Sequence, residues 1–189
     1  MIAAAMLILS ATLCPSQNVE RNQTVLVREV NFSGDLGEST DELHEYTKFL
    51  TGHRLERKKV LEDASSAVGK ALQHRGYLKA GVTPQLRSLK PSPGSKDAEV
   101  ALELTIKAGK QYRVKDLTFV GLSSQLEEGD LTQACNIRGG EIADGEQVGS
   151  CITNLRTLFH QKGQDVVVMP SMRFDESASA VSLQFDVEK

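Results

Sequence analysis

The sequence predicts an α+β protein built from two tandem copies of one small module, and an internal repeat is the main reason. Val27–Gly34 aligns with Val114–Gly121, and both segments read apolar, basic, acidic, apolar, polar, Phe, any residue, Gly. Without a change of offset, Gly76 aligns with Gly163. The apolar positions of a helix-like segment between these points also match in frame. A repeat kept in frame over this length indicates duplication of a structural unit.

The first element of each copy is predicted to be a strand. It is rich in β-branched and aromatic residues and ends at a glycine that permits a tight turn. The alternation of apolar and polar residues breaks at Arg28-Glu29 and again at Lys115-Asp116. Because both copies break at the same place, we expect them to share a β-bulge or a late strand start.

Two helices are predicted to follow this strand. Ser39–Glu42 and Ser124–Glu127 both fit a capping box, in which Ser and Glu satisfy free backbone N–H groups. The second helix has apolar residues at 61, 64, 68, 71 and 72, with matching ones at 148, 151, 155, 158 and 159. Gly76 and Gly163 then stop this helix, because glycine accepts a left-handed conformation.

Two more strands complete the unit. The last one alternates strictly, so one of its sides faces a core. The strand before it contains Pro84 in the first copy and Pro170 in the second, and proline within a sheet belongs at an edge. The prediction is two β-α-α-β-β modules, residues 24–107 and 111–189, each a small three-stranded sheet with two helices packed on one face. A six-residue deletion in the second copy falls in the loop between these strands.

The bulk composition excludes some functions. A net charge of −3 and a pI near 5.8 argue against nucleic-acid binding. Residues 1–16 are predicted to be a signal peptide, because the apolar run Ile2–Leu13 is too short to span a bilayer. A buried N-terminal strand is the alternative. Cys14 stands where a lipoprotein cysteine could, although Leu13 before it is larger than lipidation favours.

The sequence offers little catalytic chemistry. The four histidines show no metal-ligand spacing, so we expect no enzyme activity, no metal and no cofactor. Cys135 and Cys151 are predicted to lie on neighbouring helices, where they could form a disulfide or remain two buried thiols. A basic cluster near the start of the first module's second helix opposes the helix dipole. It could be a docking patch for an acidic partner or for anionic headgroups, but a solvated linker is the favoured interpretation; it comprises Arg54, Arg57, Lys58 and Lys59.

The element order and motifs resemble the polypeptide-transport-associated (POTRA) domain. The opening strand fits the pattern apolar-x-x-apolar-x-Phe-x-Gly, and the helix end His-Arg-Gly-Tyr at 74–77 is similar to the family's junction. The segment 108–114 resembles the short connection between successive POTRA domains. In the second copy, Gln164 stands where the family has Tyr.

This resemblance implies a periplasmic docking protein for outer-membrane protein assembly or polypeptide transport. Its partners would be unfolded outer-membrane protein clients, periplasmic partner proteins or an associated outer-membrane β-barrel. The alternatives are a truncated or split barrel-assembly protein without its barrel, and an envelope or cell-division docking protein. Exposed edge strands predict binding by β-augmentation, in which a client strand joins the sheet. The predicted contact residues are Val82, Leu86, Val166, Val167, Val168 and Met169, with the valine-rich edge of the second copy favoured.

Overall fold

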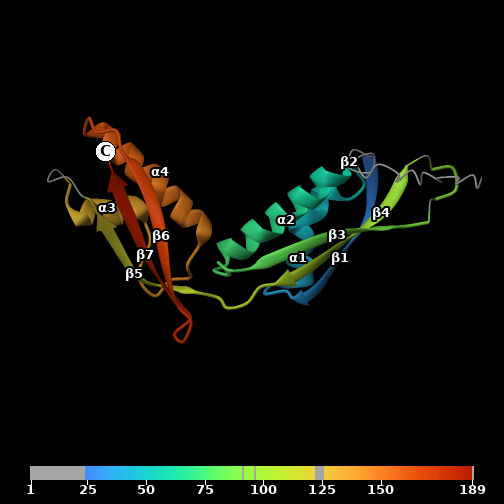
Figure 1. Cartoon of the computed structure of the whole chain (residues 1–189), viewed down its shortest axis with the longest axis horizontal. Helices are drawn as coiled ribbons and strands as arrows, with labels where there is room; N and C mark the ends of the chain where they lie inside the picture. Colours follow the sequence, from blue (N-terminus) through green and yellow to red (C-terminus); the bar gives the residue numbers. More distant parts are fainter. Residues whose placement is uncertain (1–23, 91, 96, 122–125, 189) are drawn as a thin grey trace, which may run out of the picture.

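The computed structural model describes residues 24–90, 92–95, 97–121 and 126–188, which form two units joined by a short linker (Figure 1). We call residues 24–107 module one and residues 113–188 module two. Each has one sheet covered by helices on one face, so the predicted α+β class is confirmed. The predicted signal peptide and Cys14 lie outside the described residues. No helix in the described ranges is both long and apolar enough to cross a membrane.

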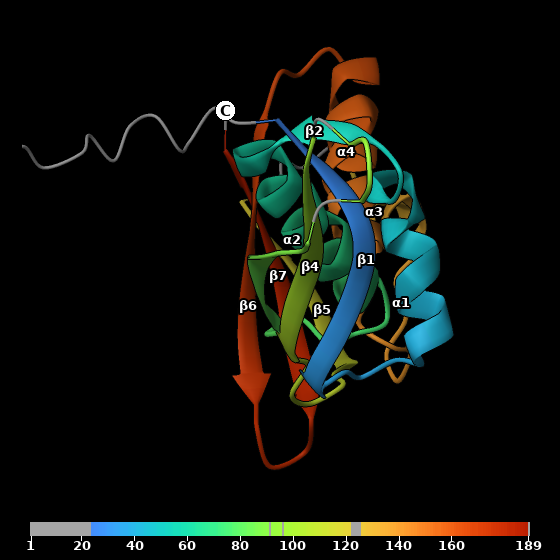
Figure 2. The same cartoon turned by 90° about the vertical axis from the view of Figure 1, so that its right-hand side faces the viewer.

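Module one has a four-stranded sheet in the order β2-β1-β4-β3. Its β1 and β4 run parallel, whereas β3 runs antiparallel to β4. Figure 2, which looks along the long axis, shows α1 beside β1. The elements are β1 (Thr24–Asp35), α1 (Thr40–Thr47), η2 (Lys48–Leu50), β2 (Arg54–Glu56), α2 (Arg57–His74), β3 (Gly81–Ser88) and β4 (Ala98–Lys107).

The prediction of three strands is wrong for module one. The short β2 pairs antiparallel with the first three residues of β1, with Val25 opposite Leu55. Sequence patterning could not show β2, because only Leu55 of its three residues is apolar. This added strand covers the start of β1 and leaves β3 as the edge on the other side of the sheet.

Module two keeps the predicted three strands in the order β5-β7-β6. Here β5 and β7 run parallel, and β6 runs antiparallel to β7. A single bridge between Arg113 and Ile142 stands where module one has β2. The elements are β5 (Arg113–Val120), α3 (Glu128–Cys135), α4 (Gly145–Gln161), β6 (Val167–Asp175) and β7 (Ala180–Glu188).

Both opening strands contain the predicted irregularity. The pairing of β1 with β4 shifts register between Val27 and Glu29, and that of β5 with β7 shifts between Val114 and Leu117. Both strands also reach a glycine with positive φ that lies against the neighbouring strand. A Cβ on Gly121 would lie 2.2 Å from the carbonyl oxygen of Val187. Only glycine fits such a position, because it has neither the φ restriction nor the side chain.

The two predicted capping boxes have different outcomes. Ser39 caps α1 as predicted, with its hydroxyl accepting from the N–H of Glu42 at 3.3 Å. In module two Ser124 lies outside the described residues, and α3 begins at Glu128 after an N-cap of Glu127 that makes no side-chain cap bond. The second helix of module two is capped by Asp144, whose carboxylate accepts from the N–H of Glu146 at 2.8 Å.

Each module has its own hydrophobic core between sheet and helices. Full burial of a Leu or Phe side chain contributes about 1.5–3 kcal/mol. Tyr112 in the linker is almost fully buried in the core of module two, so the linker itself is anchored there. The largest fully buried side chains are Leu43, Leu50, Leu72, Leu102, Leu104 and Ile106 in module one, and Phe159, Phe185, Leu131, Leu155 and Leu183 in module two.

The longer β3–β4 loop of module one is tied to the sheet by a buried carboxylate. Glu99 accepts from Arg28 at 2.7 Å and from Ser92 at 2.9 Å, and its side chain is only 3% exposed. The hydrogen bond from Arg28, followed by the one from Ser92, lowers the pKa of Glu99 to about 2. The charged form of Glu99 therefore anchors this loop.

Backbone hydrogen bonds fix the orientation of the two modules at their junction. The N–H of Tyr112 donates to the carbonyl of Gly76 at 2.9 Å, and the N–H of Ala143 donates to the carbonyl of Tyr112 at 2.9 Å. The side-chain amide of Gln111 also donates to the carbonyl of Arg75. The linker is thus bonded to the end of α2 on one side and to module two on the other.

Two groups of charged side chains cross the same junction. At the end of α2, His74 lies 2.8 Å from the carboxylate of Asp144 and 3.4 Å from that of Glu146, at the start of α4. In the β6–β7 turn, Glu176 accepts from Tyr112 and contacts Lys79 of module one. The hydrogen bond from Lys79, with that from Tyr112, lowers the pKa of Glu176. His74 is half-exposed in the last turn of α2, and its contacts with α4 connect the two modules.

Candidate binding edges

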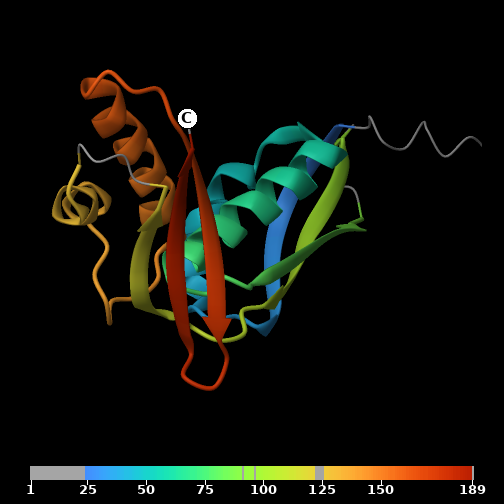
Figure 3. The same cartoon turned by 60° about the vertical axis from the view of Figure 1, so that its left-hand side comes forward.

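The two prolines mark the free edges of the two sheets. Pro84 pairs with Leu104 in module one and Pro170 pairs with Phe185 in module two, both on an antiparallel terminal strand. In Figures 1 and 3 the free edge of β6 faces module one. A free edge presents unpaired backbone N–H and C=O groups that a second chain can use.

The six predicted contact residues are not equivalent. Val168 is buried in the core of module two, and Val82 and Leu86 are half-buried against the core of module one. Val167 and Met169 are exposed, by 51% and 42%. Val166 lies just before β6 and is half-buried against the core.

Met172 is not among the residues predicted from the sequence, yet its side chain is 38% exposed on β6. It pairs with buried Leu183 and therefore lies on the helix side of β6. Its position corresponds to that of Leu86 in β3, two residues after the proline in each strand. Aligning the two prolines in the sequence shows that Met172 and Leu86 are equivalent. The exposure of the Met172 side chain, however, depends on packing that the sequence does not show.

The modules differ beside their edges. In module one, shallow depressions between α2 and β3 are lined by small residues of α2, including Ser65, Ser66 and Gly69. At the offset of 87 residues, Ile152, Thr153 and Arg156 occupy these positions in α4. Ile152 packs against the core of module two, so the corresponding space is filled. Side chains of an added strand therefore have more room beside β3 than beside β6.

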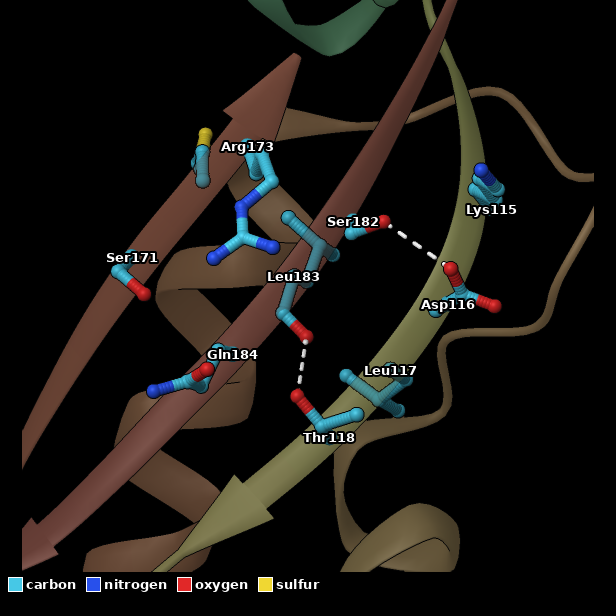
Figure 4. A pocket seen from close by; sticks show the side chains of 10 residues that line it. Lys115, Asp116, Leu117, Thr118, Ser171, Arg173, Ser182, Leu183 and Gln184 are labelled. Atoms are coloured by element: carbon cyan, nitrogen blue, oxygen red, sulfur yellow. Dashed lines mark hydrogen bonds between the residues drawn. The ribbon is translucent and has the colours of Figure 1, made fainter. Parts of the chain in front are cut away.

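The sheet of module two has a polar recess on the face opposite its helices (Figure 4). Ser182 donates to the carboxylate of Asp116 at 3.1 Å, and Thr118 donates to the carbonyl of Leu183 at 3.4 Å. Arg173 and Gln184 lie over the same face. The two hydrogen bonds join β5 to β7 in a way typical of a solvated sheet face. Within the described ranges, no group of three His, Cys, Asp or Glu side chains could hold a metal ion.

The basic cluster does not form a continuous unpaired patch. Arg54 lies in β2 and pairs with Asp97 at 2.6 Å. Lys58 pairs with Glu62 at 3.4 Å, and Lys59 with Asp63 at 2.9 Å, both one helical turn on. Because the segment forms β2 and the first turn of α2, its interpretation as a linker is wrong. Arg57 begins α2 and is partly buried.

Cys135 and Cys151 lie where the sequence placed them, at the end of α3 and on the inner face of α4. The structure joins their sulfur atoms, with the Cα atoms 4.1 Å apart. Both side chains are buried in the core of module two. A disulfide here would link the two helices across 16 residues of chain.

Residues 25–109 match the model of the POTRA family, described as surface antigen variable number repeat. Module one is a POTRA domain. No curated protein sequence matches the chain.

Solved structures extend the POTRA fold to module two. POTRA domains 3–5 of BamA from Haemophilus influenzae align with a TM-score of 0.70 at 15% identity, over 94% of this chain and 69% of that one. BamA from Haemophilus ducreyi lacking POTRA domains 1–3 aligns with a TM-score of 0.69 at 19% identity, over 87% of this chain. Alignments this long include both modules. This chain spans 29% of the Haemophilus ducreyi structure, and at these identities the likeness shows the fold alone.

Proposed function

We propose that this chain is a non-enzymatic periplasmic scaffold that binds extended segments of unfolded outer-membrane proteins during their assembly or transport. The observation that carries the proposal is the pair of free edge strands, β3 and β6, in two POTRA-fold modules of fixed relative orientation. Likeness to BamA POTRA domains supports export to the periplasm and association with periplasmic partners or an outer-membrane barrel.

Strand addition suits this role because it forms hydrogen bonds with the backbone of the client. Main-chain hydrogen bonds supply affinity that depends little on client sequence, and pockets for alternate side chains add selectivity. The depressions between α2 and β3 could take such side chains in module one. In module two the exposed Met172 offers an apolar neighbour on the helix side of the strand.

The test is titration of the ¹⁵N-labelled chain with synthetic peptides that copy single strands of an outer-membrane barrel. Strand addition is expected to shift amide signals of β3, β6 or both, and to slow their hydrogen exchange. The matched control is the same peptide with prolines at alternate positions, which removes its donors on one side. Shifts confined to helices, or equal shifts with the control peptide, would contradict the proposal.

A further inference from the structure

The backbone ladder of module one identifies which residues face its free edge. Just beyond β3, the N–H of Leu89 donates to the carbonyl of Glu99 at 2.9 Å. Bonded and non-bonded pairs alternate along an antiparallel ladder. The neighbouring even-numbered residues therefore turn their backbone groups away from β4 and toward solvent; they are Val82, Pro84, Leu86 and Ser88.

The same alternation applies to β6. Pro170 stands opposite Phe185 as Pro84 stands opposite Leu104, and proline cannot donate to the ladder from either place. The residues that face the free edge of module two are accordingly Val168, Pro170, Met172 and Phe174.

Two independent features obstruct strand addition along the first half of each edge, residues 82–84 of β3 and 168–170 of β6. The carbonyl of Val82 accepts from the hydroxyl of Ser65 in α2 at 3.4 Å, and the carbonyl of Val168 accepts from the guanidinium of Arg156 in α4 at 3.5 Å. The next edge-facing residue in each strand is the proline, which has no N–H to offer. An added strand would therefore find one acceptor already engaged and one donor missing.

The backbone groups in the second half of each edge are not engaged in this way. Met172 and Phe174 keep their N–H and C=O groups, and in the described part of the chain no side chain bonds to them. In module one, the described residues likewise place no side-chain hydrogen bond on the backbone N–H and C=O groups of Leu86 and Ser88. Leu86 and Met172 each bring an apolar side chain to this half, so both copies present the same chemistry at the same register.

We propose that strand addition is confined to the half of each edge after the proline, residues 85–88 and 171–175, and that its partner is a short extended segment with an apolar side chain beside Leu86 or Met172. The inference rests on the proposed function and adds where on the edge the client binds. Pro84 with Ser65, and Pro170 with Arg156, determine its register. A client of this kind would occupy four or five residues of edge, rather than a whole strand.

The test uses the ¹⁵N-labelled full chain and an eight-residue peptide of alternating Val and Thr with a Lys at each end. In the unmodified chain, shifts and slowed exchange are expected at 171–175 and 85–88, with 167–169 unchanged. The double variant Arg156→Ala with Pro170→Val frees the acceptor and restores the donor. Its footprint should extend to Val168, and its binding should tighten roughly five-fold for each added backbone hydrogen bond.

Met172→Pro supplies the converse test. The N–H of Met172 faces the free edge, so its removal leaves the ladder with β7 intact while obstructing the second half of the edge. Binding at β6 should be lost, whereas Met172→Leu, which keeps the N–H, should bind as the unmodified chain does. A footprint over the whole of β6, or an unchanged footprint in the double variant, overturns the half-edge inference and leaves strand addition standing. No footprint on either edge overturns both.

Discussion

Replacement of Gly121 by Ala should destabilise module two far more than the same replacement at Gly163. Both glycines have positive φ, at +82° and +72°, so each substitution forces an L-residue into the left-handed region. They differ in what the new methyl group meets. At Gly121 the Cβ would lie 2.2 Å from the carbonyl oxygen of Val187 on β7, whereas at Gly163 no atom lies within 4 Å.

The expected magnitudes follow from that difference. The left-handed conformation alone costs about 1–2 kcal/mol, which is the whole effect at Gly163. At Gly121 the oxygen belongs to backbone and cannot rotate away, so β5 and β7 must separate and weaken their ladder. We expect a loss of about 3 kcal/mol or more, in the range that strained backbone sites reach.

Urea unfolding followed by circular dichroism measures the difference, and amide exchange assigns it to a module. For a slope of about 1–2 kcal/mol per molar urea, a difference of about 1–2 kcal/mol between the two variants should separate their midpoints by about 0.5–2 M. The same comparison can be made in module one. A Cβ on Gly34 would lie 2.3 Å from the carbonyl oxygen of Ile106, whereas a Cβ on Gly52 would have no atom within 4 Å. Equal destabilisation by Gly121→Ala and Gly163→Ala would refute this reasoning.

Three further outcomes are expected. Non-reducing mass spectrometry should find Cys135 and Cys151 protected from alkylation, and replacing both with Ala should cost about 3 kcal/mol; full alkylation of the native chain would contradict the disulfide. Because the folded-state pKa of Glu99 lies near 2, below its unfolded value of 4.5, its contribution is complete above the unfolded value and is lost as pH falls toward 2. The stability gap between the unmodified chain and Glu99→Gln should close over that interval, and a constant gap would argue against the anchor. Gly76→Ala should alter the orientation of the modules in residual dipolar couplings, since its Cβ would lie 2.7 Å from Ile142, while Gly163→Ala should not.

The parts of the fold that the sequence predicted are those that local patterns determine. The bulges after Val27 and Val114 appear in the sequence as a break in alternation, and they appear in the structure as a register shift. The edge positions of Pro84 and Pro170 follow from the missing N–H. Each of these features needs only the residue and its immediate neighbours.

The features that sequence reasoning missed depend on contacts between distant residues. His74 and Asp144 are 70 positions apart and meet only because the linker orients the modules. The exposure of Met172 depends on where the helices leave β6 uncovered, which no periodicity shows.

The shorter β6–β7 turn lies where module two meets module one. In module one the corresponding β3–β4 connection is longer, nine residues (89–97) against four (176–179), and it lies at the end remote from the linker, anchored by Glu99. Glu176 in the shorter turn contacts Lys79, so extra residues inserted there would push the neighbouring copy away. The two halves of the duplication thus meet head to tail through unlike surfaces, as units of a linear array do, and they are not interchangeable. A chimera that exchanged these two turns would keep both hydrophobic cores. It would lose the fixed relative orientation of the two modules, and with it the fixed relative position of edge strands β3 and β6.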